Sequence, residues 1–230
     1  GVFVLSADGR TPGEVARALV EWGFGDSLIV VMEALGGHRE LINWYSADEL
    51  ANELTNETPQ VSAKDTAKAP ADKPQPAFAD LNLLAVAARA ASAARVIPYA
   101  PGLADDWFEH DGQITKREIR AVSISSLRPQ YGQMLWDIGC GSGSIAIEWL
   151  LAHPSTHAVA VEQCPERAYR AARNAAALGV PRLDLRTGEA SQLFAELPTP
   201  DAIFLGGGVR DIRVIEASWD ALPVGGRLVV

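Results

Sequence analysis

The sequence has few of the residues that bind metals or form disulfides. Its 230 residues include two cysteines, Cys140 and Cys164, and four histidines, and these show neither CxxC nor His-ligand spacing. A disulfide framework is therefore not expected, and we predict no metal site. The simplest interpretation is a protein of a reducing, cytoplasmic compartment.

Long apolar runs and a positive charge excess are also missing. No run approaches the roughly 20 apolar residues that a membrane helix needs. The 29 Asp and Glu outnumber the 20 Lys and Arg, which gives a net charge of −9. A sequence-wide basic field for nucleic acid is therefore absent. We expect neither a membrane nor a nucleic acid as partner, and association with further copies of the chain stays open.

Residues 1–97 carry the alternating pattern of a partial α/β domain. Strands are expected at residues 2–5 and 28–32 and in the first part of residues 78–94. Residues 11–14 and 46–49 have the pattern of helix capping boxes, with Thr11 and Ser46 as caps. The first residue is not methionine and the last ones are an apolar run, so we expect a fragment of a longer protein.

Residues 55–76 differ in composition from the rest of the chain. They contain four prolines, mixed charges and Val61 as their only large apolar residue. Such a segment cannot bury enough apolar surface to offset its ordering entropy. We therefore predict a disordered insertion at about 55–76.

Residues 98–230 predict a second domain, in which strands and helices alternate. A capping box at residues 115–118 opens a helix that runs to about residue 127. The following segments are expected as strands (134–138, 158–162, 183–186, 202–205, 227–230) and helices (145–152, 166–178, 191–197). This order predicts an α/β fold with the parallel sheet of Rossmann-like domains.

A glycine-rich turn joins the first of these strands to its helix. It is Asp137-Ile138-Gly139-Cys140-Gly141-Ser142-Gly143. Glycines permit a tight turn and let a ligand approach the backbone. Dinucleotides such as NAD are one candidate ligand, because residues 141–146 also fit G-x-G-x-x-G/A, a weak pattern on its own.

Two carboxylates favour S-adenosylmethionine over NAD as the ligand of this turn. Asp137 ends the strand before the first glycine, where it can face an ammonium group and would repel a pyrophosphate. Glu162 ends the next strand, where a carboxylate can accept both ribose hydroxyls. Glu189 and Ala190 follow the third strand, where the backbone can contact an adenine.

Two further groups are candidates for contacting a substrate. Gly206, Gly207 and Gly208 follow the fourth strand, and their lack of side chains leaves room for a bulky substrate. Lys116, Arg117 and Arg120, with Arg128, form a basic cluster that is either a solvated helix face or an anion-binding wall. Thr115 is an N-cap or a ligand contact. No catalytic residue is assigned, because Cys140 has no evident histidine partner.

The runs QITKREIRAVSISSL, MLWDIGCGSGSIAIEW, VAVEQCPERAYRAARNAAALGV and GEASQLFAELPTPDAIFLGGG resemble the decarboxylating precorrin methyltransferases of cobalamin biosynthesis. The run LSADGRTPGEVARALVEWGFGDSLIVVMEALGGHRE resembles the C-terminal half of the C-5 methyltransferase of the same pathway. FADLNLLAV resembles the last strand of that partner. Together they are similar to the family of fused precorrin-6Y C-5,15-methyltransferases.

This resemblance implies a class I S-adenosylmethionine-dependent domain at residues 98–230, preceded by part of a tetrapyrrole methyltransferase domain at 1–97. It implies methylation of C-15 and loss of carbon dioxide from the C-12 acetate of a polycarboxylate precorrin, with C-5 methylation by the partner domain. It also places the cofactor on Thr115, residues 139–143, Glu162 and Ala190. A methyltransferase for RNA or a small metabolite and a non-catalytic cofactor-binding module remain alternatives.

Overall fold

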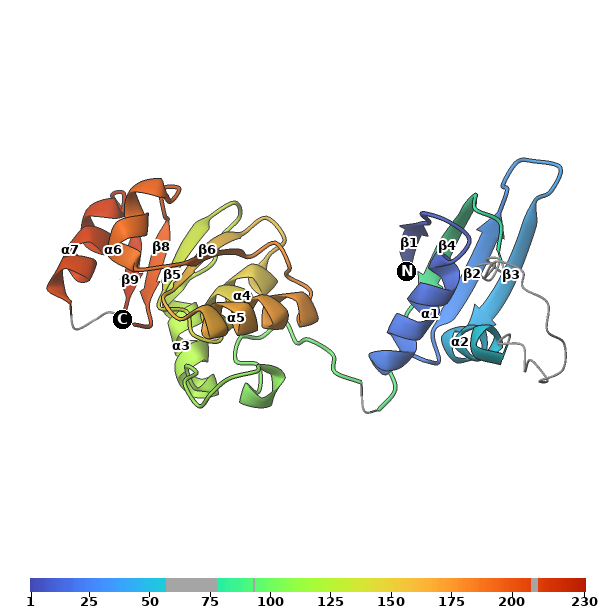
Figure 1. Cartoon of the computed structure of the whole chain (residues 1–230), viewed down its shortest axis with the longest axis horizontal. Coiled ribbons are helices and arrows are strands. Elements are labelled where there is room, and N and C mark those ends of the chain that lie inside the picture. Colours follow the sequence, from blue (N-terminus) through green and yellow to red (C-terminus); the bar gives the residue numbers. More distant parts are fainter. Residues whose placement is uncertain (57–77, 93, 208–210) are drawn as a thin grey trace, which may run out of the picture. The chain divides into compact units, whose positions relative to one another are not determined.

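The computed structural model describes residues 1–56, 78–92, 94–207 and 211–230 (Figure 1). The chain divides into two compact units, Gly1–Val96 and Ile97–Val230. The insertion expected at residues 55–76 lies, from residue 57 on, outside the described residues, as does Gly208. No helix in the described ranges is both long and apolar enough to cross a membrane.

In its described residues, the first unit is a four-stranded antiparallel sheet with two helices. Its elements are β1 (Val2–Leu5), α1 (Thr11–Glu21), β2 (Leu28–Glu33), β3 (Leu41–Ser46), α2 (Ala47–Asn56) and β4 (Asn82–Ala87). The strand order is β1-β4-β2-β3. Alternate sheet residues such as Ile29 and Leu84 pack against Ala16 of α1 and Leu50 of α2, so one face of the sheet forms the core.

The two capping boxes expected in this unit have different outcomes. The Ser46 box is confirmed: the Glu49 amide donates to Ser46 Oγ at 3.1 Å, and the Ser46 amide donates to Glu49 Oε2 at 2.9 Å. The Thr11 box is wrong. Thr11 is already the first residue of α1, and its hydroxyl accepts the amides of Ala7 and Asp8 in the preceding turn. Strand β3 was not foreseen.

The second unit is a five-stranded parallel sheet between two helical layers. Its elements are η1 (Asp105–Trp107), α3 (Arg117–Leu127), β5 (Met134–Ile138), α4 (Ser144–Ala152), β6 (His157–Glu162), α5 (Pro165–Ala177), β7 (Asp184–Thr187), α6 (Ala190–Leu193), η2 (Phe194–Glu196), β8 (Ala202–Leu205), α7 (Ile212–Ala221) and β9 (Arg227–Val229). The strand order is β7-β6-β5-β8-β9. The Rossmann-like fold expected from the sequence is confirmed.

Two cores cover the two faces of this sheet. Leu135 faces the core that α3, α4 and α5 build, and Trp136 faces the core beside α6 and α7. Figure 1 shows α4 and α5 together along one side of the sheet. The chain goes outward from β5 to β6 on one side and to β8 on the other. The strand order therefore changes direction at β5. In parallel sheets of this kind, a crevice opens at the carboxyl ends of the strands at such a point.

Two details of this unit correct the expectations. The Thr115 capping box is wrong, because α3 begins at Arg117 with Lys116 as an N-cap residue that makes no side-chain cap bond. Helix α7 was not foreseen from the sequence. Its N-cap is Asp211, whose side chain accepts the amide of Arg213.

Candidate functional site

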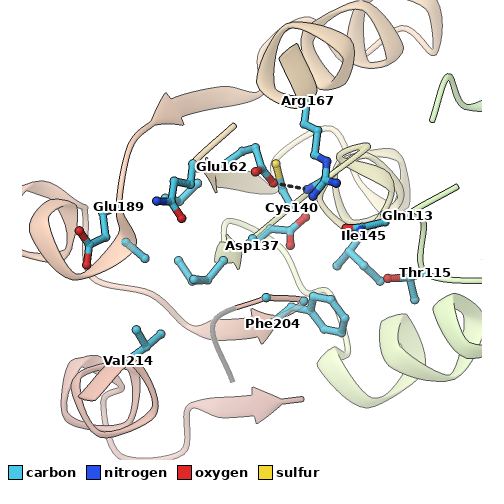
Figure 2. A pocket seen from close by; sticks show the side chains of 18 of the residues that line it. Gln113, Thr115, Asp137, Cys140, Ile145, Glu162, Arg167, Glu189, Phe204 and Val214 are labelled. Carbon is cyan, nitrogen blue, oxygen red and sulfur yellow. Dashed lines mark hydrogen bonds between the residues drawn. The ribbon is translucent and has the colours of Figure 1, made fainter. Parts of the chain in front are cut away.

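A cavity of about 590 Å³ lies at the carboxyl ends of β5, β6 and β8 (Figure 2). Its walls come from the glycine turn after β5, the turns after β6, β7 and β8, and α7. A further wall is the segment before α3, residues 109–115, which we call the strap and of which residues 113–115 line the cavity. The volume lies within the range usual for small-molecule sites. The crevice expected from the strand order is therefore a formed pocket.

The glycine turn forms one wall of the cavity and is pinned to the neighbouring strand. The amides of Gly139 and Cys140 both donate to the carbonyl of Val161, at 2.8 and 3.1 Å. Gly139, Gly141 and Gly143 have φ values of +73°, +56° and +76°. Residues with a Cβ rarely adopt this region, so glycine is needed at each position.

Close packing explains two of the glycines after β8. A Cβ on Gly139 would stand 2.7 Å from the N and Cα atoms of Gly207, and one on Gly206 would stand 3.0 Å from the Gly139 carbonyl oxygen. The amides of Gly206 and Gly207 both donate to the carbonyl of Ile138. The two turns touch backbone to backbone, and both line the cavity.

Asp137 is a buried carboxyl with one unsatisfied oxygen. The residue is 1% exposed, and Oδ2 accepts the amide of Ala146 at 3.1 Å. Oδ1 has no hydrogen-bond partner among the described residues. Burial raises the pKa of Asp137 to about 7, and the charge of Glu162 adds to the rise. Since an unpaired buried polar atom is costly, this oxygen is suited to a ligand donor.

Glu162 is held in place by two backbone amides. Oε2 accepts the amide of Gly141 and Oε1 accepts the amide of Cys164, both at 2.9 Å. Each carboxylate oxygen has a second lone pair, so both can still accept a hydroxyl. Glu162 lines the cavity, and its position fits the ribose-binding role expected from the sequence.

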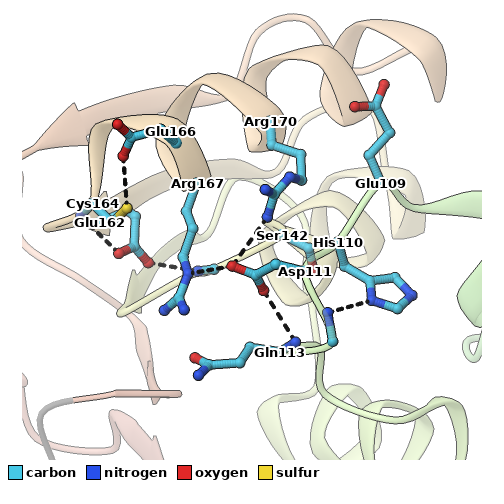
Figure 3. Close-up of polar contacts among 12 residues, drawn as sticks. Glu109, His110, Asp111, Gln113, Ser142, Glu162, Cys164, Glu166, Arg167 and Arg170 are labelled. Atoms are coloured by element: carbon cyan, nitrogen blue, oxygen red, sulfur yellow. Dashed lines mark hydrogen bonds and ion pairs between the residues drawn. The ribbon is translucent and has the colours of Figure 1, made fainter.

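The strap before α3 is fixed to α5 by charged groups (Figure 3). Asp111 Oδ2 lies 2.8 Å from Arg167 Nε and 3.3 Å from Arg170 Nη1. The Arg167 hydrogen bond, with smaller contributions from the Gln113 amide and Arg170, lowers the pKa of Asp111 to about 2. These contacts hold Gln113, Ile114 and Thr115 at the cavity wall.

Asn174 joins the same strap to the glycine turn. Its side chain accepts the amide of Glu109 at 2.8 Å and donates to the carbonyls of Glu109 and Ser142 at 3.0 and 2.9 Å. Ser142 is 2% exposed, and Gly143 faces Ala171 of α5. Neither Ser142 nor Gly143 lines the cavity. Both contact α5 instead and help to fix the turn in place.

The basic cluster does not line the large cavity, and the assignment of Arg120 to substrate is wrong. Arg120 is fully buried: Nε donates to Glu148 at 2.6 Å, and Nη1 lies 3.1 Å from Asp105. Its guanidinium also bonds the carbonyls of Leu103 and Thr115. A sequence pattern cannot distinguish this buried arginine from a surface one.

The other members of the cluster lie on the surface or at a second cavity, and the assignment of Lys116 and Arg117 to substrate stays a prediction. Lys116 pairs with Asp105 at 3.4 Å, and Arg117 Nε donates to the carbonyl of Gly102 at 2.9 Å. Arg128 ends α3 in a left-handed conformation and lines a second cavity. None of these basic residues lines the large cavity.

The remaining expected residues lie at the large cavity. Thr115, Cys140, Glu189 and Ala190 line it, as do Gly206 and Gly207. Burial raises the pKa of the Cys140 thiol, so a thiolate nucleophile is disfavoured there. Among the described residues, no group of three or more His, Cys, Asp or Glu side chains could hold a metal ion.

Sequence reasoning missed several lining residues, namely Gln113, Gln163, Arg167, Phe204, Asp211 and Val214. Asp211 and Val214 could not be found because α7 was not expected. Arg167 carries a local signal, since it lies in the first turn of α5, five residues after Glu162.

Comparison with known proteins identifies the family. A model of the precorrin methyltransferase domain matches residues 106–230. The chain belongs to the precorrin methyltransferase domain family. The resemblance inferred from the sequence is thereby confirmed, and so is S-adenosylmethionine as the methyl donor of this methyltransferase class. The residues that hold the donor remain a prediction.

Individual relatives of this precorrin methyltransferase domain agree. The precorrin-6Y C(5,15)-methyltransferase [decarboxylating] of a Sinorhizobium species is 45% identical over 228 residues, which are 99% of this chain and 50% of that protein. The one from Mycobacterium tuberculosis H37Rv is 40% identical over 99% of this chain and 51% of its own length. The chain thus spans about half the length of the curated relatives it matches.

Other relatives match only part of the chain. A probable cobalt-precorrin-6B C(15)-methyltransferase (decarboxylating) of Saccharolobus solfataricus is 39% identical over 136 residues, which are 56% of this chain and 68% of that protein. The crystal structure of the C-terminal domain of the precorrin-6Y C5,15-methyltransferase from Rhodobacter capsulatus aligns with a TM-score of 0.54 and 38% identity. It covers 57% of this chain and 71% of that one.

Proposed function

We propose that residues 98–230 methylate C-15 of a precorrin and remove carbon dioxide from its C-12 acetate, in cobalamin biosynthesis. The observation that carries this proposal is a crevice, in a domain matched by the family model, whose lining includes the carboxyl groups of Asp137 and Glu162. These groups suit a cationic methyl donor. The cytoplasm is the proposed location. The names of the relatives supply the substrate class.

The residues at the cavity fit S-adenosylmethionine better than they fit NAD. The unsatisfied Oδ1 of Asp137 needs a donor, which an ammonium group supplies and a pyrophosphate does not. We propose that Thr115, Glu162, Glu189, Ala190 and the part of the glycine turn that lines the cavity, residues 137–141, hold the cofactor. Ser142 and Gly143, which the resemblance also assigns to the cofactor, would act by shaping this turn. When bound, this cofactor supplies a methyl group already activated by a sulfonium.

The residues of the chain then contribute position rather than acid-base chemistry. The amides of Gly206 and Gly207 bond to Ile138, and the Asn174 side chain joins the strap to the glycine turn. Such rigid placement supplies the alignment that methyl transfer needs. Gly206 and Gly207 leave their part of the wall without side chains, which supports their assignment to substrate. No catalytic residue is assigned.

We further propose that residues 1–97 are the C-terminal part of a C-5 methyltransferase domain. Relatives named for both C-5 and C-15 match this chain over 99% of its length, and that match includes the first unit. The Saccharolobus relative, which is named for C-15 alone, matches 56% of the chain. This difference in coverage supports a division of the two activities between the units.

Calorimetry followed by a coupled product assay tests the proposed function. The chain should bind S-adenosylmethionine and S-adenosylhomocysteine competitively and should not bind NAD. With a precorrin substrate it should release labelled carbon dioxide from the C-12 acetate and methylate C-15.

The matched variant Glu162→Gln keeps the side-chain shape and removes its charge. Losing a charged acceptor costs about 1.5–3 kcal/mol, so cofactor affinity should fall roughly 10- to 150-fold. NAD binding of comparable strength would refute the cofactor assignment. Cofactor binding without either product would refute the pathway assignment and leave an RNA, small-metabolite or non-catalytic role.

A further inference from the structure

The cavity is lined by several acids and one described base. Asp137, Glu162, Glu189 and Asp211 contribute carboxyl groups, and Arg167 is the one cationic side chain among the described lining residues. An acidic pocket suits the sulfonium and ammonium groups of S-adenosylmethionine. It does not suit the carboxylate at the methionine end of the same molecule, which needs a cation or other donors.

Arg167 lies where such a donor is needed. It comes from the first turn of α5 and lines the cavity, and Figure 2 shows its side chain between Glu162 and Gln113. In Figure 2, Arg167 points toward the side of Gln113, and Glu189 lies on the other side of Glu162. The end of the pocket near Glu189 is the one that we assign to adenine, so Arg167 stands toward the opposite end.

The contacts of Arg167 fix its guanidinium and leave it able to bind a ligand. Its Nε donates to Asp111 Oδ2, and no described residue accepts a hydrogen bond from Nη1 or Nη2. Its side chain is 29% exposed. Asp111 is shared with Arg170, so two guanidinium groups face one carboxylate. Asp111 therefore orients one edge of the Arg167 guanidinium.

We infer that Arg167 binds the methionine carboxylate of S-adenosylmethionine and that Asp111 orients it for this contact. The inference rests on the proposed function, because it assumes that this cavity holds the cofactor. It makes Arg167 a specificity residue for the amino-acid end of the ligand. The strap then has two roles: Gln113 and Thr115 form part of the cavity wall, and Asp111 orients the Arg167 guanidinium.

Decarboxylated S-adenosylmethionine is the probe that isolates this contact. It keeps the adenosine, the sulfonium and the amino group and lacks the carboxylate. The wild-type chain should bind S-adenosylmethionine roughly 10-fold or more tightly than the decarboxylated form, as for a charge-assisted hydrogen bond. Calorimetry on both ligands gives the ratio without any turnover.

The variant Arg167→Gln should abolish this preference by weakening S-adenosylmethionine alone. Affinity for the decarboxylated ligand should stay the same or rise, because a cation has been removed from beside a doubly cationic molecule. General damage to the fold would weaken both ligands, so opposite responses identify a direct contact. Arg167→Lys should restore part of the preference, because the ammonium keeps the charge.

Arg170→Gln is the matched control. It removes a cation from the same helix and a contact to the same carboxylate, but Arg170 does not line the cavity. The preference should survive in this variant. Its loss there would overturn the inference, because strap position rather than contact would then set the ratio.

The remaining outcomes are equally decisive. Equal binding of the two ligands by the wild-type chain would overturn this inference and leave the proposed function standing. Arg167→Gln that keeps both cofactor affinities but raises the KM for the precorrin would assign the arginine to a substrate carboxylate and overturn it too. A wild-type chain that binds neither ligand would overturn the proposed function and the inference together.

Discussion

Gly207 lies directly against Gly139, so the turn after β8 occupies the space that a side chain in the turn after β5 would need. A Cβ on Gly139 would stand 2.7 Å from both the N and Cα atoms of Gly207. The two turns come from adjacent strands and close one side of the cavity. Their contact makes the shape of the pocket depend on two glycines 68 positions apart in the sequence.

Gly139→Ala should therefore destabilise the second unit more than backbone strain alone explains. The matched control is Gly179→Ala, which has a φ of +76° against +73° at Gly139 but nothing within 4 Å of its Cβ. Strain in the left-handed region costs about 1–2 kcal/mol at both positions, and overpacking adds about 1–3 kcal/mol at Gly139 alone. Urea unfolding of both variants measures the difference, and equal losses would contradict the close contact.

Arg120→Met should reduce the free energy of unfolding by about 3–5 kcal/mol, because it leaves the buried Glu148 carboxylate without its charged partner. Arg117→Met is the control, since Arg117 is exposed and makes one bond, to the Gly102 carbonyl. Its loss should cost about 1 kcal/mol or less. If charge changes at Arg120 altered only the KM for a substrate and left stability intact, the structural role of this residue would be refuted.

The affinity for S-adenosylmethionine should fall as the pH drops below about 7. The Asp137 carboxyl has its pKa raised to about 7, so it is increasingly protonated below that pH and loses the charge that an ammonium needs. Binding should then release a proton, which calorimetry in buffers of different ionisation enthalpy detects. Asp137→Asn should bind more weakly, with little pH dependence in this range.

The same carboxyl should affect the stability of the ligand-free chain. Its pKa rises from 3.8 to about 7 on folding, so the folded chain binds more protons than the unfolded chain between these pH values. Its contribution to stability is lost as the pH rises through that window, by on the order of a few kcal/mol. Asp137→Asn should thus melt at a higher temperature than the wild type at pH 8. A lower melting temperature would show that the charge is not penalised.

Ser46→Ala should destabilise the first unit by about 1 kcal/mol, because it removes a hydroxyl that accepts the Glu49 amide at the start of α2. Thr115→Ala tests the opposite case, since α3 has no side-chain cap bond at its start. It should leave the stability of the second unit within about 0.5 kcal/mol of the wild type. Thermal unfolding of each variant checks both values.

Much of the second unit could be predicted because its signals are local. The strand before Gly139, Asp137 at its end and the glycine turn follow one another within a few residues, and Glu162 ends the next strand in the same way. The fold brings these groups together at one edge of the sheet. Parallel strands place their carboxyl ends side by side, so Asp137 and Glu162 share a cavity although 25 positions separate them.

What the sequence could not give depends on contacts between distant segments. The sequence does not distinguish Lys116, Arg117 and Arg120 from one another. Only the fold shows that Arg120 is buried and bonded to Glu148. The capping pattern recurs at three places, and only Ser46 uses it, because the chain before Thr11 and Thr115 places the helix start elsewhere.

The Arg120 and Glu148 pair ties an irregular segment to the helical core. The amides of Gly102 and Leu103 donate to the two Glu148 oxygens at 2.7 and 2.9 Å, and the guanidinium bonds the Leu103 carbonyl. Separating this segment from the helices would leave the charges of Arg120 and Glu148 buried without these hydrogen-bond partners, so the segment cannot unfold on its own. We expect these two loop amides to exchange with deuterium as slowly as those of α4, as part of one cooperative unit.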